Sequence, residues 1–335
     1  MNGIIHILRG KRSAQTIQDI SLFKLERWTA ILKNESKTFV DQGVHDLKKY
    51  HLIEEHDKKE VTLSPAGKQS LDSLSDSFEM PRSFNGLKYE WNESRAYFWE
   101  HLSLLVQSIS FIKERQYTFI PISYNRDVQK KVKQLLKNKN NNLQQLGSQL
   151  YTELGTILGF LPEKEAELFV SRLTSFFRVG RTFDQLSVSY SDDPLFTAIA
   201  FRSIIHEMMN RVAETPRSYP LLYSLISENE ELATVTKTSA VTKKLLASGH
   251  TIQQIAVKRQ LKLSTIEDHI IELSIHDSNF NFTDFITTEQ MKEIREYADR
   301  LSTKKLRPIK GELGDKYTYF QIRLAISSQK GEKNS

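Results

Sequence analysis

The chain has 335 residues, a length that predicts two or three domains rather than one. Hydrophobic residues make up 39% of it, enough for buried cores, and the absence of cysteine excludes disulfides and thiolate metal sites. No apolar run is long enough for a signal peptide or a membrane-spanning helix, so we expect a cytoplasmic protein without a membrane partner.

The net charge of +6 is unevenly distributed along the chain. Residues 86–150 and 235–335 carry an excess of Lys and Arg, whereas residues 151–234 between them carry an excess of Asp and Glu. Basic segments favour polyanions through the release of counterions. Because the excess is modest, any affinity for nucleic acid should be moderate and sensitive to salt.

Residues 1–80 show the element order of a winged helix. Short helices are expected near residues 4–8 and 16–20, and a third over 37–49 with Phe39, Val40, Val44 and Leu47 on its apolar side. Two strands follow on either side of a charged turn at 56–59, and then a last helix. The turn would be the wing. The alternative is a small α+β domain whose charged side chains are only solvated.

Residues 86–230 are predicted to form a central helical bundle, after a linker near residues 75–86. Trp99 is expected in its core, and Tyr117–Tyr124 is expected to be a strand or a buried loop, although Pro121 disfavours a central strand. The amphipathic helix over 126–139 has a basic side that could follow a phosphate backbone or could simply face solvent.

The segment 236–273 has the pattern of three short helices, and residues 236–327 form the third predicted domain. Gly249 suits the end of the first helix. Capping boxes are predicted at Thr251 with Gln254 and at Ser264 with Glu267, as starts of the second and third helices. The turn between these two helices is short, as in a helix-turn-helix.

Two later helices are predicted from caps at Thr287 with Gln290 and at Thr318 with Gln321. A basic loop is expected between them, around Pro308. It would contain Lys304, Lys305, Arg307 and Lys310.

Catalytic signatures are missing from the sequence. Gly10-Lys11 does not belong to a phosphate-binding G-x-x-x-x-G-K-[ST] loop, because Ile5 stands where the first glycine should be. His206-Glu207 resembles a zinc-protease helix, but Asn210 replaces the second histidine, so His206 is expected to be structural. Asp192-Asp193, before Pro194, is expected to cap a helix. We therefore expect a protein that is not an enzyme, without catalytic residues, cofactor or metal.

Residues 238–326 resemble the helicase helix-turn-helix domain at the C-terminus of bacterial RecQ-type DNA helicases. The resemblance rests on LLASGHTIQQIAVKRQLKLSTIEDHIIEL, on RPIK at 307–310 and on YFQIRLA at 319–325. ILRGKRS at 7–13 and VTLSPAG at 61–67 are similar to the winged-helix (RQC) domain of the same helicases. The order of parts resembles the YpbB-type, helicase-associated proteins. The helicase motor and the four cysteines of the helicase zinc subdomain are absent from this sequence.

The resemblance implies a non-catalytic DNA-binding accessory subunit of a RecQ-type helicase, acting at the nucleoid in DNA repair, recombination or replication restart. The DNA would be forked, single-stranded or double-stranded, with little sequence specificity. Candidate DNA contacts in the N-terminal part are Lys37, His45, Lys48, Lys49, Lys58 and Lys59. Candidate contacts in the helix-turn-helix, at and before the start of its third helix, are Lys258, Arg259, Lys262, Ser264, Thr265 and His269.

Two other functions remain open at this stage. One is a transcription regulator that reads an operator, although Glu267, Asp268 and Glu272 on the third helix would repel phosphates. The other is an adaptor that binds only proteins.

Overall fold

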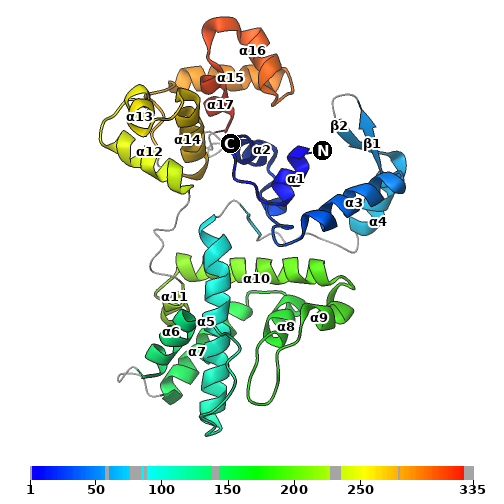
Figure 1. The fold of residues 1–335 in the computed structure, drawn as a ribbon, viewed down its shortest axis with the longest axis vertical. Coiled ribbons are helices and arrows are strands. Elements are labelled where there is room, and N and C mark those ends of the chain that lie inside the picture. Colours follow the sequence, from blue (N-terminus) through cyan, green and yellow to red (C-terminus); the bar gives the residue numbers. More distant parts are fainter. Residues whose placement is uncertain are drawn as a thin grey trace. The chain divides into compact units, whose positions relative to one another are not determined.

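A computed structural model describes the structure of most of the chain, namely residues 2–56, 60–75, 84–86, 89–137, 143–226, 235–277 and 280–327. The described residues are mainly helical, as predicted (Figure 1). Within this part of the chain, no helix combines the length and the apolar composition needed to cross a membrane.

The contacts divide the chain into two units. Residues 1–40 and 232–335 form the first, here called the terminal unit, and residues 41–231 form the second, here called the middle unit. The predicted division into 1–80, 86–230 and 236–327 concerns segments that fold on their own. The grouping of contacts does not test independent folding, so that division stays a prediction.

The terminal unit contains the three helices predicted over 236–273. They are α12 (Lys237–Ala247), α13 (Ile252–Arg259) and α14 (Leu263–His276). Helix α12 ends where Gly249, at φ 80°, donates its N–H to Leu246, and the next N–H, of His250, reaches back to Leu245. This is the Schellman arrangement, and it confirms the predicted role of the glycine.

Helix α13 begins with the predicted capping box, because Thr251 and Gln254 exchange both hydrogen bonds. The capping box predicted at Ser264 and Glu267 is wrong. The N-cap of α14 is Lys262, two residues earlier, and it makes no side-chain hydrogen bond. Ser264 therefore lies inside the first turn, where its hydroxyl is not placed to cap the helix.

Three further helices complete the C-terminal part of this unit: α15 (Thr288–Arg300), α16 (Leu306–Leu313) and α17 (Tyr319–Ser327). The predicted caps at Thr287 and Thr318 are both formed. The basic loop predicted around Pro308 is wrong in part, because Lys304 and Lys305 precede a helix, whereas Arg307, Pro308 and Lys310 lie within that helix, α16. Proline is tolerated there since it lies in the first turn, where its missing N–H would have no helical partner.

The first helices of the chain pack onto this C-terminal part. They are α1 (Asn2–Leu8) and α2 (Ala14–Phe23), and α2 contacts both α14 and α17. Ile17 and Ile20 of α2 are fully buried. Arg323 of α17 donates to the buried side chain of Gln18 at 2.7 Å, and Lys304 donates to the carbonyl of Leu22 at 2.6 Å. Helices α1 and α2 and the described C-terminal helices therefore form one packed body.

The elements predicted for residues 37–75 are present in the predicted order. Helix α3 (Lys37–Lys49) leads to strands β1 (Ile53–His56) and β2 (Glu60–Leu63), which pair antiparallel with Ile53 opposite Leu63, and α4 (Pro65–Ser75) follows. The apolar side predicted for α3 is wrong in part, because Val40 is buried whereas Phe39 and Leu47 are exposed.

The rest of the middle unit is a helical bundle. Its helices are α5 (Tyr89–Lys113), α6 (Arg126–Lys137), α7 (Leu143–Leu158), α8 (Glu163–Ser171), α9 (Phe183–Tyr190), α10 (Pro194–Glu214) and α11 (Pro220–Ser224). As predicted, Trp99 packs in the core, with its ring 4.8 Å from that of Phe201. The carboxylate of Glu153 on α7 accepts the N–H groups of Leu221 and Leu222, which fixes the start of α11.

Two further predictions about the bundle are confirmed and one is wrong. Asp193 caps α10 by accepting the N–H of Phe196 at 2.9 Å. His206 is buried, its ring stacks 5.1 Å from that of Phe84, and its role is structural. The segment 117–124 is neither a strand nor buried. It is a loop, held by Gln107, whose side-chain amide bonds the backbone on both sides of Pro121.

Candidate nucleic-acid interface

The turn between α13 and α14 presents its lysines to solvent. Lys258, in the last turn of α13, is exposed, and its Nζ lies 3.3 Å from Nε2 of His250. Lys262, the N-cap of α14, and Ser264, in its first turn, are also exposed. Gln260 closes α13 in the left-handed region at φ 53°, which brings the two helices together over a short connection. Three predicted contacts therefore share one exposed turn.

Arg259 points into the protein instead. Its guanidinium donates to the carbonyl and to the hydroxyl of Thr238 on α12, at 2.9 and 2.8 Å. It also contacts Thr242 and lies 3.3 Å from Nδ1 of His269. These bonds tie the end of α13 to α12, so the predicted DNA contact of Arg259 would require it to leave three partners.

His269 belongs to the same network and is 6% exposed. Its Nδ1 lies 2.9 Å from the hydroxyl of Thr242, and its Nε2 lies 3.2 Å from that of Thr238. Burial and the charge of Arg259 lower the pKa of His269. Because a guanidinium has no acceptor, Nδ1 must accept from Arg259, which leaves the proton of the neutral ring on Nε2. The prediction that this ring contacts DNA is wrong, because it is enclosed by protein.

The acidic side chains of α14 also have internal partners. Glu272 is 4% exposed, and it accepts the N–H of Thr236 at 2.5 Å and the hydroxyl of Ser239 at 2.6 Å. It therefore fixes the start of α12. Asp268 forms an ion pair with Arg323 of α17 at 2.7 Å. The repulsion of phosphates expected from these carboxylates is consequently weaker than the sequence indicated.

Helix α14 is covered by its neighbours over most of its length. It contacts α2, α12, α13 and α17, and every described side chain from His269 to Ile275 is buried. Toward its start, Leu263 is exposed and Thr265 is half-buried. Burial raises the pKa of Glu267, one turn further along. Only the first turn of α14 is therefore available to a nucleic acid.

The N-terminal candidates are exposed where the structure describes them. Lys37, His45, Lys48 and Lys49 all lie on the surface of α3. Lys48 forms an exposed ion pair with Glu55 at 2.5 Å. Lys58 and Lys59, the candidates on the wing turn, lie outside the described residues.

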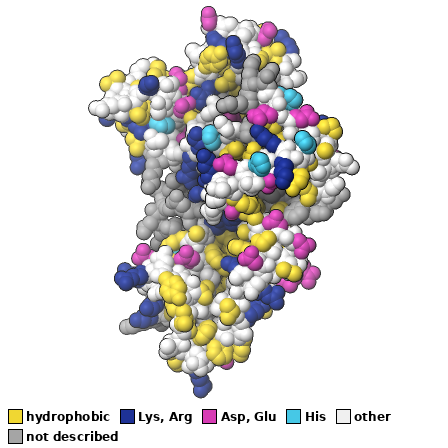
Figure 2. Space-filling view, turned by 45° about the vertical axis from the view of Figure 1, so that its right-hand side comes forward, with side chains coloured by type: hydrophobic (Ala, Val, Ile, Leu, Met, Phe, Trp, Pro, Cys, Tyr) yellow, Lys and Arg dark blue, Asp and Glu magenta, His cyan; other side chains and the backbone are white. Residues whose placement is uncertain are grey.

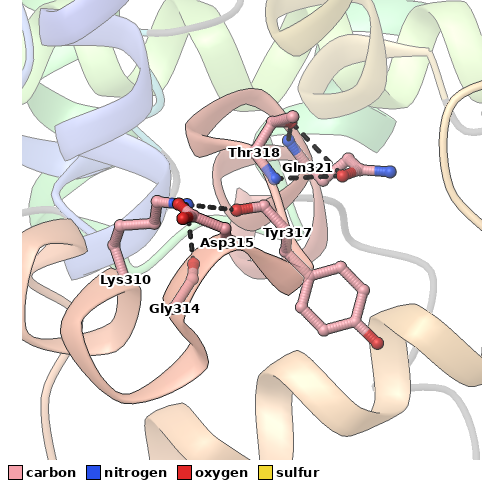
Figure 3. A network of polar contacts seen from close by, with 6 residues as sticks. All are labelled: Lys310, Gly314, Asp315, Tyr317, Thr318 and Gln321. Carbon is pink, nitrogen blue, oxygen red and sulfur yellow. Dashed lines mark hydrogen bonds and ion pairs between the residues drawn. The ribbon is translucent and has the colours of Figure 1, made fainter.

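Lys310 of the RPIK segment serves the fold (Figure 3). Lys310 donates to the carbonyls of Gly314 and Tyr317, at 2.6 and 2.8 Å, and lies 3.4 Å from a carboxylate oxygen of Asp315. It thus closes the turn between α16 and α17. Arg307, by contrast, is exposed in the first turn of α16. The segment that carries part of the resemblance to helicases is mainly a structural clamp.

Comparisons with known proteins agree with this geometry. Residues 238–326 match the family model of a helix-turn-helix domain, which confirms the helix-turn-helix predicted from the sequence. Over 331 residues the chain is 30% identical to Protein YpbB of Bacillus subtilis (strain 168), and the alignment covers 98% of this chain and 92% of that protein. No solved structure matches the chain. A helix-turn-helix domain of this kind suggests DNA binding.

Proposed function

Since the chain belongs to the YpbB family, we propose that it is a non-catalytic accessory subunit that binds DNA for a RecQ-type DNA helicase. The helicase would supply the motor, and this chain would hold DNA during repair, recombination or replication restart at the nucleoid. The observation that carries the DNA-binding part is the exposed turn between α13 and α14, where Lys258, Lys262 and Ser264 lie together. The helicase part rests on the resemblance in sequence.

The expected mode of binding follows from what this turn offers. Lysine ammonium groups contact phosphates, which every DNA sequence presents in the same way. Reading of bases needs side chains along an exposed helix face, and α14 has its later turns buried. We therefore expect DNA binding with little sequence preference and a strong dependence on salt.

Reversing the two exposed lysines tests the DNA-binding part. The variant Lys258→Glu with Lys262→Glu should bind forked, single-stranded and double-stranded DNA more weakly and to a similar extent, measured by fluorescence anisotropy. The plot of log affinity against log salt should become less steep by about 2, one for each lost phosphate contact.

A matched control carries the same change of charge elsewhere. Lys68→Glu with Lys292→Glu alters two exposed lysines on α4 and α15 that do not belong to the α13–α14 turn, and it should keep its affinity within about twofold at physiological salt, where exposed charges are screened. Equal losses in both double variants would show that only net charge matters. Wild-type protein that fails to bind DNA even at low salt would leave the adaptor as the better function.

The helicase part is tested separately, by a pull-down from cell extract at moderate salt with and without nuclease. We expect a RecQ-type helicase to be retained in both conditions. Association that disappears with nuclease would mean that DNA bridges the two proteins, and no association would refute the partnership without affecting the DNA-binding result.

A further inference from the structure

The loop between α8 and α9, residues 172–182, exposes hydrophobic side chains on a fixed backbone. Phe177 is 76% exposed and Val179 is 79% exposed. Figure 1 shows this loop beside the C-terminal end of α5, and the N–H of Phe176 donates to the hydroxyl of Ser110 there at 3.0 Å. In Figure 2, hydrophobic side chains reach the surface of the middle unit at several places.

Hydrogen bonds hold the 172–182 loop in one shape. They join Ser175 N–H to the carbonyl of Arg178, Arg181 N–H to that of Ser171, Gly180 N–H to the hydroxyl of Thr174, and the Arg178 guanidinium to the carbonyl of Val170. A side chain at Gly180 would place its Cβ 2.2 Å from the carbonyl oxygen of Arg172. A surface that is already ordered loses little conformational entropy when it binds.

Aromatic packing connects this loop with a second exposed loop, residues 115–124. Phe176 packs edge-on against Phe111, with ring centroids 5.4 Å apart, and Phe111 lies 4.7 Å from Phe119. Next to these packed rings, Tyr117 is 75% exposed and Ile120 is 76% exposed. The two loops and the end of α5 therefore form one apolar surface, here called the Phe177 surface.

The charge around the Phe177 surface is mainly positive. Lys113, Arg115, Arg178 and Arg181 are exposed on these segments, and Glu114 is the single carboxylate in residues 111–124 and 172–182. Exposed apolar side chains within a basic border match a partner that presents an apolar pocket with carboxylates at its rim.

We propose that the Phe177 surface docks a partner protein with such a pocket, in which Phe177 and Val179 are the anchors. Val179 and Ile120, exposed on the same surface, have no aromatic face on which a base could stack. This favours a protein over a single-stranded nucleic acid. This surface is distinct from the α13–α14 turn, and the inference rests on the proposed function only for the choice of the helicase as first probe.

The test compares binding of the purified RecQ-type helicase to the full-length wild-type chain and to the variant Phe177→Ser with Val179→Ser. The variant should bind at least about 30-fold more weakly, the effect of losing a central apolar anchor. Its thermal unfolding and its DNA affinity should be unchanged, because both side chains are exposed. The control Tyr151→Ser with Val188→Ser removes two equally exposed side chains of the same unit, on α7 and α9, and should bind like the wild type.

Equal binding of the helicase by wild type and by the Phe177 variant would overturn the proposal, and so would a loss of single-stranded DNA affinity in that variant. If the wild type does not bind the helicase, the helicase part of the proposed function fails by itself. A photo-crosslinking phenylalanine at position 177 of the full chain, used in cells, then decides the docking proposal. A crosslinked protein supports it when, once purified, it binds the Phe177→Ser with Val179→Ser variant at least about 30-fold more weakly than the wild type. Equal binding of that protein to both, crosslinks to nucleic acid alone, or no crosslinks overturn it.

Discussion

Replacing Glu272 with alanine should destabilise the terminal unit strongly. The buried carboxylate accepts hydrogen bonds from the backbone N–H and hydroxyl of Thr236 and from the hydroxyl of Ser239. A hydrogen bond to a charged group contributes about 1.5–3 kcal/mol, and hydroxyls can turn toward other acceptors, whereas the N–H cannot. We therefore expect a loss of about 3 kcal/mol in the free energy of unfolding, which lowers Tm by roughly 6–12 °C in a unit of this size.

Urea unfolding followed by circular dichroism measures the change in free energy, and calorimetry measures Tm. Ser239→Ala should cost less, because it removes one of three donors, and the double variant should show coupling, since both changes affect the same carboxylate. The control Glu296→Ala removes an exposed carboxylate 4.0 Å from Lys292 and should change stability by less than about 0.5 kcal/mol. A Glu272 variant as stable as this control would refute the conclusion that Glu272 stabilises the start of α12.

Two further predictions concern the same unit. Arg259→Ala should lower the free energy of unfolding by about 1–3 kcal/mol. Measured on folded protein, this variant should weaken DNA binding much less than Lys258→Ala does. A larger loss of DNA affinity in Arg259→Ala than in Lys258→Ala would show that Arg259 contacts DNA. Burial, together with the charge of Arg12, lowers the pKa of His276 to about 4. In the unfolded chain this histidine therefore takes up a proton below about pH 6.5, whereas in the folded protein it does so only near pH 4. Stability should therefore be level above about pH 6.5 and should fall as the pH drops toward 4, and His276→Asn should flatten this dependence in acid-unfolding curves; an unchanged slope would contradict the burial argument.

Signals that act within three or four residues were read correctly from the sequence. The caps at Thr251 and Thr287 and the glycine that ends α12 depend on side chains reaching their own backbone, so their spacing is sufficient evidence. The same pattern at Ser264 failed because it does not fix the first residue of a helix. Helix α14 starts at Leu263, and the carbonyl of Lys262 already accepts from Thr265 and Ile266.

The partners of each helix could not be read in this way. A short helix was predicted near residues 16–20, but its sequence does not say that it packs on α14 and α17. The bond between Arg323 and Gln18 joins residues 305 positions apart, and no local pattern marks it. For the same reason Arg259 and His269 looked like DNA contacts. The sequence pattern of a basic side chain near a recognition helix is the same whether its partner is a phosphate or a threonine on α12.

The sequence prediction also failed for an apolar run that no described part of the chain covers. The run 117–124 is rich in apolar residues and was expected to be a strand or a buried loop, yet Tyr117 and Ile120 are exposed, as Phe177 is. Burial of an apolar run is the usual outcome in a single chain, because it removes apolar area from water. An ordered run that stays exposed is therefore the sign of a surface for another molecule, which a sequence pattern cannot separate from a core segment.

The position of α14 limits what the helix-turn-helix can recognise. A recognition helix discriminates bases when several side chains along one face reach the groove. Here Ser264 and Thr265 in the first turn are short, and the later side chains are held between α2, α12, α13 and α17. Affinity must then come from Lys258 and Lys262, whose phosphate contacts carry no sequence information. The limit on sequence specificity is thus steric, set by helices that enclose α14, and it holds although Asp268 is paired with Arg323 and Glu272 is buried with its carboxylate hydrogen-bonded.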